Sequence, residues 1–325
     1  MALTFIVICA IFTIGVTGAV DPWTTTGDLS RLLNDHFGDN RHHVTNPAAK
    51  SAAVNFIENT FKGYGMQVVN EDFDTDNPNF RGKNVVGMWP GRLTGTRLDR
   101  PIVLTAHYDS RRDRAAVQDN GSGLAALMEA ARLITSQPCV QEYLVVFAAL
   151  DFEFDEGPDF DNAACYNGYC GSKDFVDQVM ARYLDSVGVN VANINGVIIL
   201  DSILNFNDTL GAQSLPETFK QVPGLKEGYE SVEQDGFRGN FILVAGRQEY
   251  DFPLYSAFYN RWDAAGHPQY KRQSVLFPLK DVVSAVETQS DPNWEVYKQF
   301  IGNDLTSFWN SSTDIKAMLL TDTRK

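Results

Sequence analysis

The hydrophobic and polar positions of the chain follow two alternating patterns. Short, continuous apolar runs recur along the sequence, and between them lie stretches in which apolar residues are spaced three or four positions apart. Continuous apolar runs are typical of buried β-strands, and the wider spacing is typical of amphipathic helices. We expect strands at residues 67–73, 83–89, 102–106, 143–150, 196–200, 241–245 and 274–278, the last strand of the chain.

The helices that this pattern predicts lie between most of these strands. The first begins at Pro47, with Asn46 as its N-cap, and is ended by Gly63. Further helices are expected at residues 121–134, 171–183, 252–262 and 293–309, and residues 205–239 are expected to be a long polar region. Apolar strands that alternate with helices imply an α/β protein with a mostly parallel sheet covered on both faces. Nothing in the composition divides residues 20–325, so we expect one domain.

Residues 1–19 form an uncharged apolar run that ends in the small residues Thr17, Gly18 and Ala19. This pattern predicts a secretory signal peptide, although the run lacks the usual lysine or arginine. An uncleaved membrane anchor is the alternative, but the run is short for a membrane span. No later stretch is long and apolar enough to cross a bilayer, so we expect a secreted, extracellular protein without membrane insertion after cleavage.

The composition and charge of the chain exclude some classes of binding partner. Hydrophobic residues make up 44% of the chain, which is enough for one large core. The formal net charge is -14 at pH 7. An acidic surface of this kind argues against nucleic acids and anionic membranes as partners.

The cysteines suit an oxidising compartment. Cys9 is lost if the signal peptide is cleaved, and Cys165 and Cys170 bracket a short, turn-rich segment. We expect these two to form a disulfide, and Cys139 to be a buried free thiol, because the strand at 143–150 separates it from the pair.

Asparagine sequons are a second feature of a secreted chain. Those at Asn207 and Asn310 are plausible glycosylation sites. A third sequon, at Asn120, lies beside the candidate site described next and is expected to remain unmodified.

Candidate catalytic residues follow three of the expected strands. His107 ends the run at 102–106, Glu153 follows the run at 143–150, and Asp201 ends the run at 196–200, while Asp119 lies before the helix that follows His107. The carboxyl ends of parallel strands share one edge of the sheet, so these four residues can converge there. Considered singly, His107 could be a satisfied core histidine and Asp119 a helix N-cap.

One histidine and two carboxylates suit a zinc ion. His107, Asp119 and Asp201 are the candidate ligands, and Glu153 is then the candidate general base. Asp109, two residues after His107, can hold the second ring nitrogen of that histidine.

These residues carry a family resemblance. Ala106-His-Tyr-Asp-Ser110, followed by Asp119-Asn-Gly-Ser-Gly123, is similar to the His-x-Asp-Ser and Asp-[Asn/Asp]-x-Ser-Gly signatures of the secreted zinc aminopeptidase superfamily. That superfamily includes bacterial leucyl aminopeptidases, glutamate carboxypeptidases, glutaminyl cyclases and the non-catalytic nicastrin. The resemblance extends over most of residues 47–309. It implies a three-layer α/β/α sandwich with a central mixed, mainly parallel sheet.

The resemblance also implies roles for individual residues. The superfamily uses two zinc ions bridged by one aspartate, and Asp119 resembles this bridge. His107 and Asp201 then match the other ligands of one ion, and Glu153 matches the base. A cis peptide bond is implied between Asp119 and Asn120. Gly171-Ser172 resembles the start of a superfamily helix, and Tyr250-Asp251-Phe252 resembles a segment near the substrate pocket.

The chain departs from the superfamily at the second ion. Phe154 stands where the superfamily has a glutamate ligand, and no histidine after His267 matches the final ligand near the last strand. The expected matching segment, residues 277–281, offers Lys280 or Asp281 instead. Glutaminyl cyclases keep these two ligands, so cyclisation is disfavoured. Asp155, Glu156 and Asp281 could replace the missing ligands and form an oxygen-rich site that would suit calcium or magnesium. A solvated acidic loop is the simpler interpretation of these residues. His267 is a further candidate ligand.

Two functions are consistent with these residues. The chain is either a secreted zinc exopeptidase of aminopeptidase type, with one zinc ion, a possible second divalent cation and weak or altered hydrolysis of peptides, or a pseudopeptidase that binds a peptide or protein partner, for example in the extracellular matrix. The loss of two ligands of the second ion favours reduced hydrolytic activity. Each metal ion stabilises the transition state by several kcal/mol.

Overall fold

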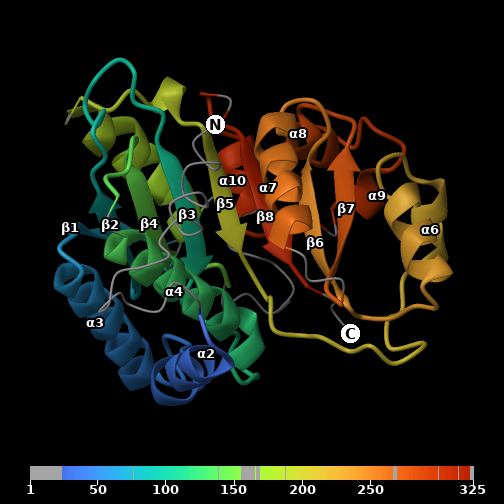
Figure 1. Ribbon diagram of the computed structural model, residues 1–325, viewed down its shortest axis with the longest axis horizontal. Helices are drawn as coiled ribbons and strands as arrows, with labels where there is room; N and C mark the ends of the chain where they lie inside the picture. Colours follow the sequence, from blue (N-terminus) through green and yellow to red (C-terminus); the bar gives the residue numbers. More distant parts are fainter. Residues whose placement is uncertain are drawn as a thin grey trace.

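A mixed sheet of eight strands runs through the part of the chain that the structure describes (Figure 1). The computed structural model describes residues 24–75, 77–137, 139–154, 165, 169–186, 188–265, 269–298, 300–313 and 315–322. The spatial order of the strands is β1-β2-β4-β3-β5-β8-β6-β7. Their bounds are Gln67–Asp74 (β1), Arg81–Trp89 (β2), Ile102–His107 (β3), Val145–Leu150 (β4), Gly196–Leu200 (β5), Phe241–Arg247 (β6), Lys271–Phe277 (β7) and Ala317–Thr321 (β8).

The strand directions determine which ends share an edge. In the middle of the sheet, β4, β3, β5 and β8 are parallel neighbours. β6 pairs antiparallel with β8, and β7 runs parallel to β6. The carboxyl ends of β3, β4, β5 and β8 therefore lie at one edge, and the carboxyl end of β7 lies at the opposite edge. In Figure 1, the arrowheads of β5 and β7 point in opposite directions.

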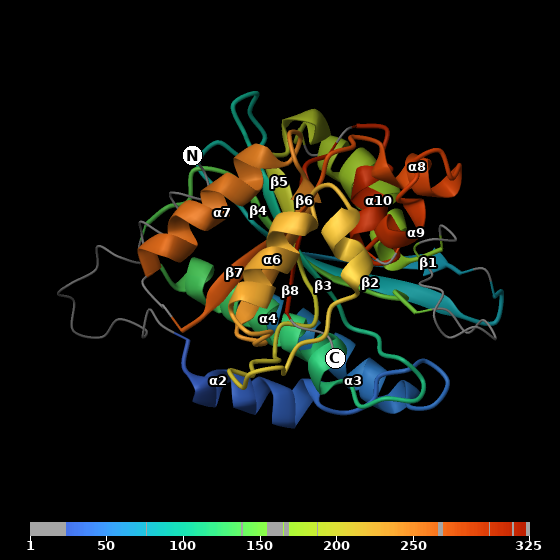
Figure 2. The ribbon, with the colours of Figure 1, turned by 90° about the vertical axis from the view of Figure 1, so that its right-hand side faces the viewer.

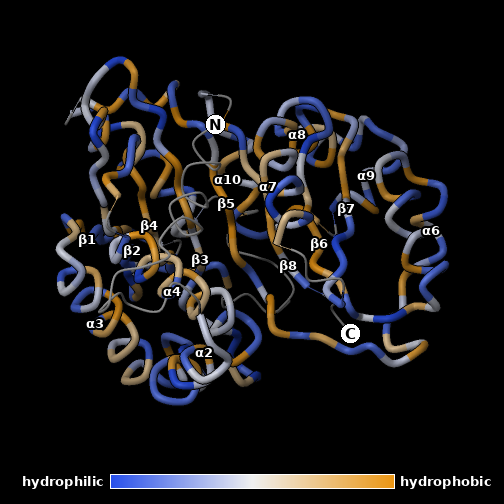
Figure 3. Tube along the Cα trace, viewed as in Figure 1, coloured by the Kyte–Doolittle hydropathy of each residue, from blue (hydrophilic) through white to orange (hydrophobic). Residues whose placement is uncertain are grey.

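Helices cover both faces, so the architecture is the expected α/β sandwich (Figures 1 and 2). One face packs against α2 (Thr26–Leu32), α3 (Pro47–Gly63), α4 (Gly123–Ser136) and α7 (Phe252–Ala265). The other packs against α5 (Gly171–Asp174), the helix Phe175–Leu184 that continues it, α6 (Lys226–Gln234), α8 (Val282–Glu287), α9 (Trp294–Tyr297) and α10 (Leu305–Trp309). Apolar residues are concentrated along the central strands (Figure 3).

The expected elements are confirmed up to β7, with ends that shift by a few residues. The N-cap of α3 is confirmed too, because the side chain of Asn46 accepts a hydrogen bond from the Ala49 amide. The expected continuous helix at 293–309 is wrong. It is divided into α9 and α10 by Gly302, whose φ of 147° is unfavourable for other residues.

Two elements lie where none was expected. α6 lies within the polar region 205–239, and β8 follows the strand that was expected to be the last. β8 is central to the sheet, since it joins β5 to β6.

The predicted disulfide between Cys165 and Cys170 is present, with a Cα–Cα distance of 4.7 Å. Cys139 is also disulfide-bonded and only half-buried, so the expectation of a buried free thiol is wrong. The predicted signal peptide at 1–19 lies outside the described residues. Within the described part of the chain, no helix has the length and apolar character of a membrane span.

Candidate metal centre

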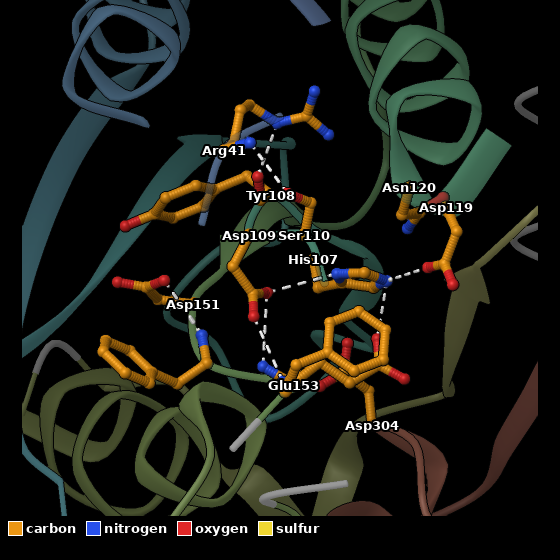
Figure 4. A network of polar contacts seen from close by, with 12 residues as sticks. Arg41, His107, Tyr108, Asp109, Ser110, Asp119, Asn120, Asp151, Glu153 and Asp304 are labelled. Carbon is orange, nitrogen blue, oxygen red and sulfur yellow. Dashed lines mark hydrogen bonds and ion pairs between the residues drawn. The ribbon is translucent and has the colours of Figure 1, made fainter. Parts of the chain in front are cut away.

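The candidate site lies at the edge where β3, β4 and β5 end. His107 is the last residue of β3, and its register partner Leu150 is the last residue of β4. Asp201 directly follows β5, whose neighbour is β3. Glu153 reaches the same place from the segment after β4 (Figure 4). The convergence expected from the sequence is therefore the arrangement that the parallel strands produce.

Three carboxylates surround the outer ring nitrogen of His107. Its Nε2 lies 2.6 Å from Oε2 of Glu153, 3.3 Å from Oδ1 of Asp119 and 3.6 Å from Oδ1 of Asp201. The side chains of His107, Glu153 and Asp201 are buried, whereas that of Asp119 is 25% exposed. The site is thus closed on the protein side and approached by solvent at Asp119.

Asp109 fixes both the histidine and the segment that carries Glu153. Its Oδ1 lies 3.2 Å from Nδ1 of His107, and its carboxylate accepts hydrogen bonds from the backbone amides of Glu153 and Phe154 at 3.2 and 3.1 Å. Burial opposes the charge of Asp109, but the hydrogen bond and charge of His107 outweigh it and lower its pKa to about 2. A charged Asp109 accepts a hydrogen bond from Nδ1 of the ring, so that Nε2 is the nitrogen that faces the three carboxylates.

The loop that carries Asp119 is attached to the end of β5. Its Asp119–Asn120 peptide bond is cis, as the resemblance implies. The buried Asn120 side chain donates to the carbonyl of Leu200 at 2.8 Å and accepts from the amides of Gly123 and Ser202 at 2.9 and 3.1 Å. These bonds place Asp119 beside Asp201. They also bury the Asn120 sequon, whereas Asn207 and Asn310 are exposed.

A buried ion pair beneath the site was not predicted. Nζ of Lys50 lies 2.6 Å from Asp151 and 4.1 Å from the centre of the Phe152 ring. Asp151 also accepts hydrogen bonds from the amides of Lys83 and Phe152. Phe152, which directly precedes Glu153, has a φ of 52°. The signal in the sequence is the position of Lys50 on the apolar face of its helix, three residues before the buried Ala53.

Asp304 is a second residue that the sequence did not disclose. It is 1% exposed at the start of α10 and lies near Glu153 (Figure 4). Its Oδ2 is buried without a hydrogen-bond partner, and Sγ of Cys165 lies 3.7 Å from its Oδ1. Burial raises the pKa of Asp304 to about 6.

The donor atoms of the site fit a cation. Nε2 of His107, Oδ1 of Asp119 and Oε2 of Glu153 are buried and make no hydrogen bond. Burial raises the pKa of Glu153 well above its usual value, and for His107 the surrounding carboxylates, Glu153 foremost, outweigh burial and raise its pKa as well. A nitrogen and several oxygens of this kind, close together and unsatisfied, match the ligands of zinc.

Of the candidates for a substitute second site, only Asp281 belongs to the described part of the chain, and it lies away from the centre. Asp281 is exposed at the start of α8, and it follows β7, so it lies at the edge of the sheet opposite to His107. Asp155, Glu156 and His267 lie outside the described residues. Asp251 points away from the centre into a buried pair with Arg247.

The expectation that residues 277–281 match the final histidine ligand of the superfamily is wrong, because these residues follow β7. Among the described residues the last strand is β8, which ends beside β5 at the edge of the site, and not β7. The matching position therefore follows Thr321, and Asp322 is the last described residue. The residue types at 277–281 therefore do not show whether the chain has this histidine ligand.

Comparisons with known proteins agree with this geometry. Residues 84–229 match the family model of Peptidase family M28. No curated protein matches the chain. The match to the family model makes the chain similar to the zinc aminopeptidase-like superfamily over residues 84–229. The chain is accordingly metallopeptidase-like, and its centre is a candidate zinc site.

Solved structures of the superfamily share the fold at low sequence identity. A leucine aminopeptidase precursor from Bacteroides thetaiotaomicron is 16% identical, with a TM-score of 0.56, and the match covers 95% of this chain and 88% of that one. A glutaminyl cyclase from the same organism, bound to N-acetylhistamine, is 16% identical with a TM-score of 0.55, covering 91% and 83%. A Zn-dependent exopeptidase from Parabacteroides distasonis is 13% identical with a TM-score of 0.52, covering 91% and 82%.

Proposed function

We propose that this chain is a secreted, zinc-dependent hydrolase of peptides, of the exopeptidase type. His107, Asp119 and Asp201 are the proposed ligands, and Glu153 is the proposed general base. The observation that carries this proposal is the set of buried donor atoms on His107, Asp119 and Glu153 that lack hydrogen-bond partners and face one another.

The chemistry follows from the positions of these side chains. A zinc ion, when bound, polarises a carbonyl group and makes water more acidic. Glu153 is close enough to the ligands to accept a proton from a water molecule there, and the positive charge of a cation favours the ionised form of its carboxyl group. Asp109 orients His107 and, through two backbone amides, the segment of Glu153.

A pseudopeptidase that binds a peptide or protein partner is the second candidate function. Phe154 favours it, because this side chain stands where the superfamily resemblance places a ligand and its ring lies 5.4 Å from that of His107, edge to face. An apolar ring in this position cannot hold a second ion. Glycosylation at the exposed Asn207 and Asn310 belongs to either form of this secreted protein.

Metal content tests the proposed site without a chosen substrate. The purified full chain is dialysed against dilute zinc and calcium and analysed for elements, beside His107→Ala and Asp201→Ala. We expect about one zinc ion per chain in the parent and none in either variant, because each variant removes a ligand. Asp281→Ala, at the opposite edge of the sheet, is the matched control and should keep the ion. Zinc bound equally tightly by His107→Ala would place the site elsewhere.

Phe154→Glu separates the two functions. If the chain is a hydrolase weakened at one position, the added carboxylate should increase the hydrolysis of aminoacyl-anilide substrates by at least about tenfold, since a further ligand strengthens metal binding and carbonyl polarisation. Phe154→Leu controls for loss of the ring. A variant that binds more metal and still does not hydrolyse any substrate of the series would support the binding protein.

A further inference from the structure

A buried group of sulfur and oxygen atoms lies close to the candidate metal centre and includes none of its proposed ligands. Cys165 and Cys170 are 4% and 1% exposed, and Asp304, at the start of α10, is 1% exposed. One ligand atom from each of these three residues lies within 4.8 Å of those of the other two. Cysteine sulfur and carboxylate oxygen are both ligands of zinc.

The carboxyl group of Asp304 is incompletely satisfied in the oxidised protein. Its Oδ1 lies 3.7 Å from Sγ of Cys165, but a sulfur atom in a disulfide has no hydrogen to donate. Its Oδ2 makes no hydrogen bond within the described part of the chain. A buried carboxyl group without partners is costly, and a missing ion is one of the explanations for such a group. Asp304 therefore offers a free ligand oxygen next to the two sulfur atoms.

Two serine hydroxyl groups surround the sulfur atoms. Oγ of Ser172 lies 3.2 Å from Sγ of Cys165 and 3.1 Å from Sγ of Cys170. Oγ of Ser307 lies 3.4 Å from Sγ of Cys170. Hydroxyl groups at these distances can donate hydrogen bonds to thiolates, as the outer partners of metal ligands do. A disulfide carries no charge, so these hydroxyl groups suit the reduced sulfur atoms better than the oxidised pair.

We propose that Cys165, Cys170 and Asp304 form a second zinc site when their disulfide is reduced. Two molecules of a low-molecular-weight thiol break the S–S bond, two cysteine thiols form, and the reductant leaves as its own disulfide. The zinc ion then replaces the two thiol protons, which pass to water, and the carboxylate of Asp304 is the third ligand. The chain thus has two mutually exclusive cross-links at this point, a disulfide in oxidising surroundings and a metal ion in reducing ones.

The zinc content of the oxidised and the reduced chain tests this proposal. The full chain is prepared once with its disulfides formed and once in a phosphine reductant, with the thiols counted by alkylation and mass spectrometry. After dialysis against dilute zinc, we expect about one more zinc ion per chain in the reduced protein than in the oxidised protein. An equal zinc content of the two forms would overturn the proposal.

Cobalt(II) identifies the ligands, because it replaces zinc and absorbs in the near ultraviolet when thiolates bind it. We expect this absorption in the reduced parent, but not in the oxidised parent or in reduced Cys165→Ser. Cys139→Ser, at a cysteine outside this group, is the matched control and should keep the absorption. Cys170→Ser gives the same test if Cys165→Ser does not fold. An additional ion without the thiolate absorption would overturn the proposal.

Asp304→Asn tests the third ligand. In the reduced chain we expect its zinc affinity to fall at least about a hundredfold, which is the upper value for the loss of an outer partner of a metal ligand. The exposed Asp281→Asn is the control and should leave the affinity unchanged. An unchanged affinity in Asp304→Asn would overturn the site with three ligands.

His107→Ala separates this inference from the proposed function. If the proposed metal centre is correct, this variant binds no zinc when it is oxidised and about one zinc ion when it is reduced. If the oxidised parent binds no zinc either, the proposed function fails. The difference in zinc content between the reduced and the oxidised chain then still decides whether the cysteine site exists.

Discussion

Burial gives the carboxyl group of Glu153 its distinct acid–base behaviour. The side chain is taken out of water beside His107, Asp201 and Asp304, and its pKa rises well above the usual range. A carboxyl group that is raised in this way is suited to exchange protons near neutral pH. Its short distance to Nε2 of His107 also makes it a possible ligand, so base and ligand must be distinguished by experiment.

Glu153→Gln makes this distinction. As a base, the residue is not needed for zinc binding, so we expect zinc stoichiometry to stay at the parent value while hydrolysis falls at least about a hundredfold, because glutamine cannot accept the proton. Elemental analysis and a peptidase assay check both results. Glu227→Gln, on the exposed surface of α6, should change neither. Loss of zinc in Glu153→Gln would make this residue a ligand.

Asp304 should make stability depend on pH. Its pKa of about 6 in the folded protein lies above the ordinary 3.8, so the folded state holds the proton more tightly than the unfolded state. The stability that this proton contributes is present below about pH 4 and is lost as the pH rises through about 6.

Asp304→Asn removes this charge. In the chelated, zinc-free protein we expect the free energy of unfolding of the variant to be about 3 kcal/mol higher than that of the parent at pH 7.5. Below about pH 4 the two free energies of unfolding should be equal. Urea denaturation at several pH values measures the difference. The exposed Asp281→Asn should show no such trend. A variant that is less stable than the parent at pH 7.5 would contradict the prediction.

At the scale of elements, β8 depends on contacts that come from elsewhere in the chain. Arg247 and Asp251 form a buried pair with two contacts of 3.0 Å. Arg247 also donates to the carbonyl of Ile315 at 2.8 Å, and Asp251 accepts from the amide of Ala317 at 3.1 Å. The pair therefore holds the first residues of β8 against β6 and α7.

Asp251→Ala should destabilise the fold by about 3–5 kcal/mol, because it leaves the Arg247 charge buried without its partner. Chemical denaturation checks this value. The double variant Arg247→Met, Asp251→Leu should lose much less, since no charge remains buried. Asp263→Ala, which breaks an exposed pair with Arg272, is the surface control and should cost no more than about 1 kcal/mol. A small effect of Asp251→Ala would show that β8 is held by its strand pairing alone.

The elements that could be predicted from the sequence are those whose pattern is local. His107, Asp119, Glu153 and Asp201 each directly follow, or closely precede, an element with a clear period, so strand direction was enough to bring them together. Lys50 and Asp304 could not be placed in this way, because their partners Asp151 and Cys165 are more than a hundred residues away in the sequence. β8 was not predicted because its apolar run is short and because the strand is stabilised by pairing with β5 and β6, which the local pattern does not show.

At the scale of the molecule, different features lie at the two edges and on the two faces of the sheet. The candidate centre occupies one edge, where four parallel strands end and β6 and β7 begin. Asp281 and the start of α8 occupy the other. The two faces carry separate apolar clusters, one below α3, α4 and α7 and one below α6, α8 and α10.

The central position of β8 also bears on how the chain is made. A ribosome releases β5 and then β6 and β7 well before residues 317–321 emerge, and β5 and β6 are not neighbours in the sheet. The nascent chain can assemble β1 to β5 early, but it has to keep the facing edges of β5 and β6 open until the strand that joins them arrives. Such unpaired edges are where aggregation begins. Vectorial synthesis thus leaves this protein exposed to self-association until β8 is inserted.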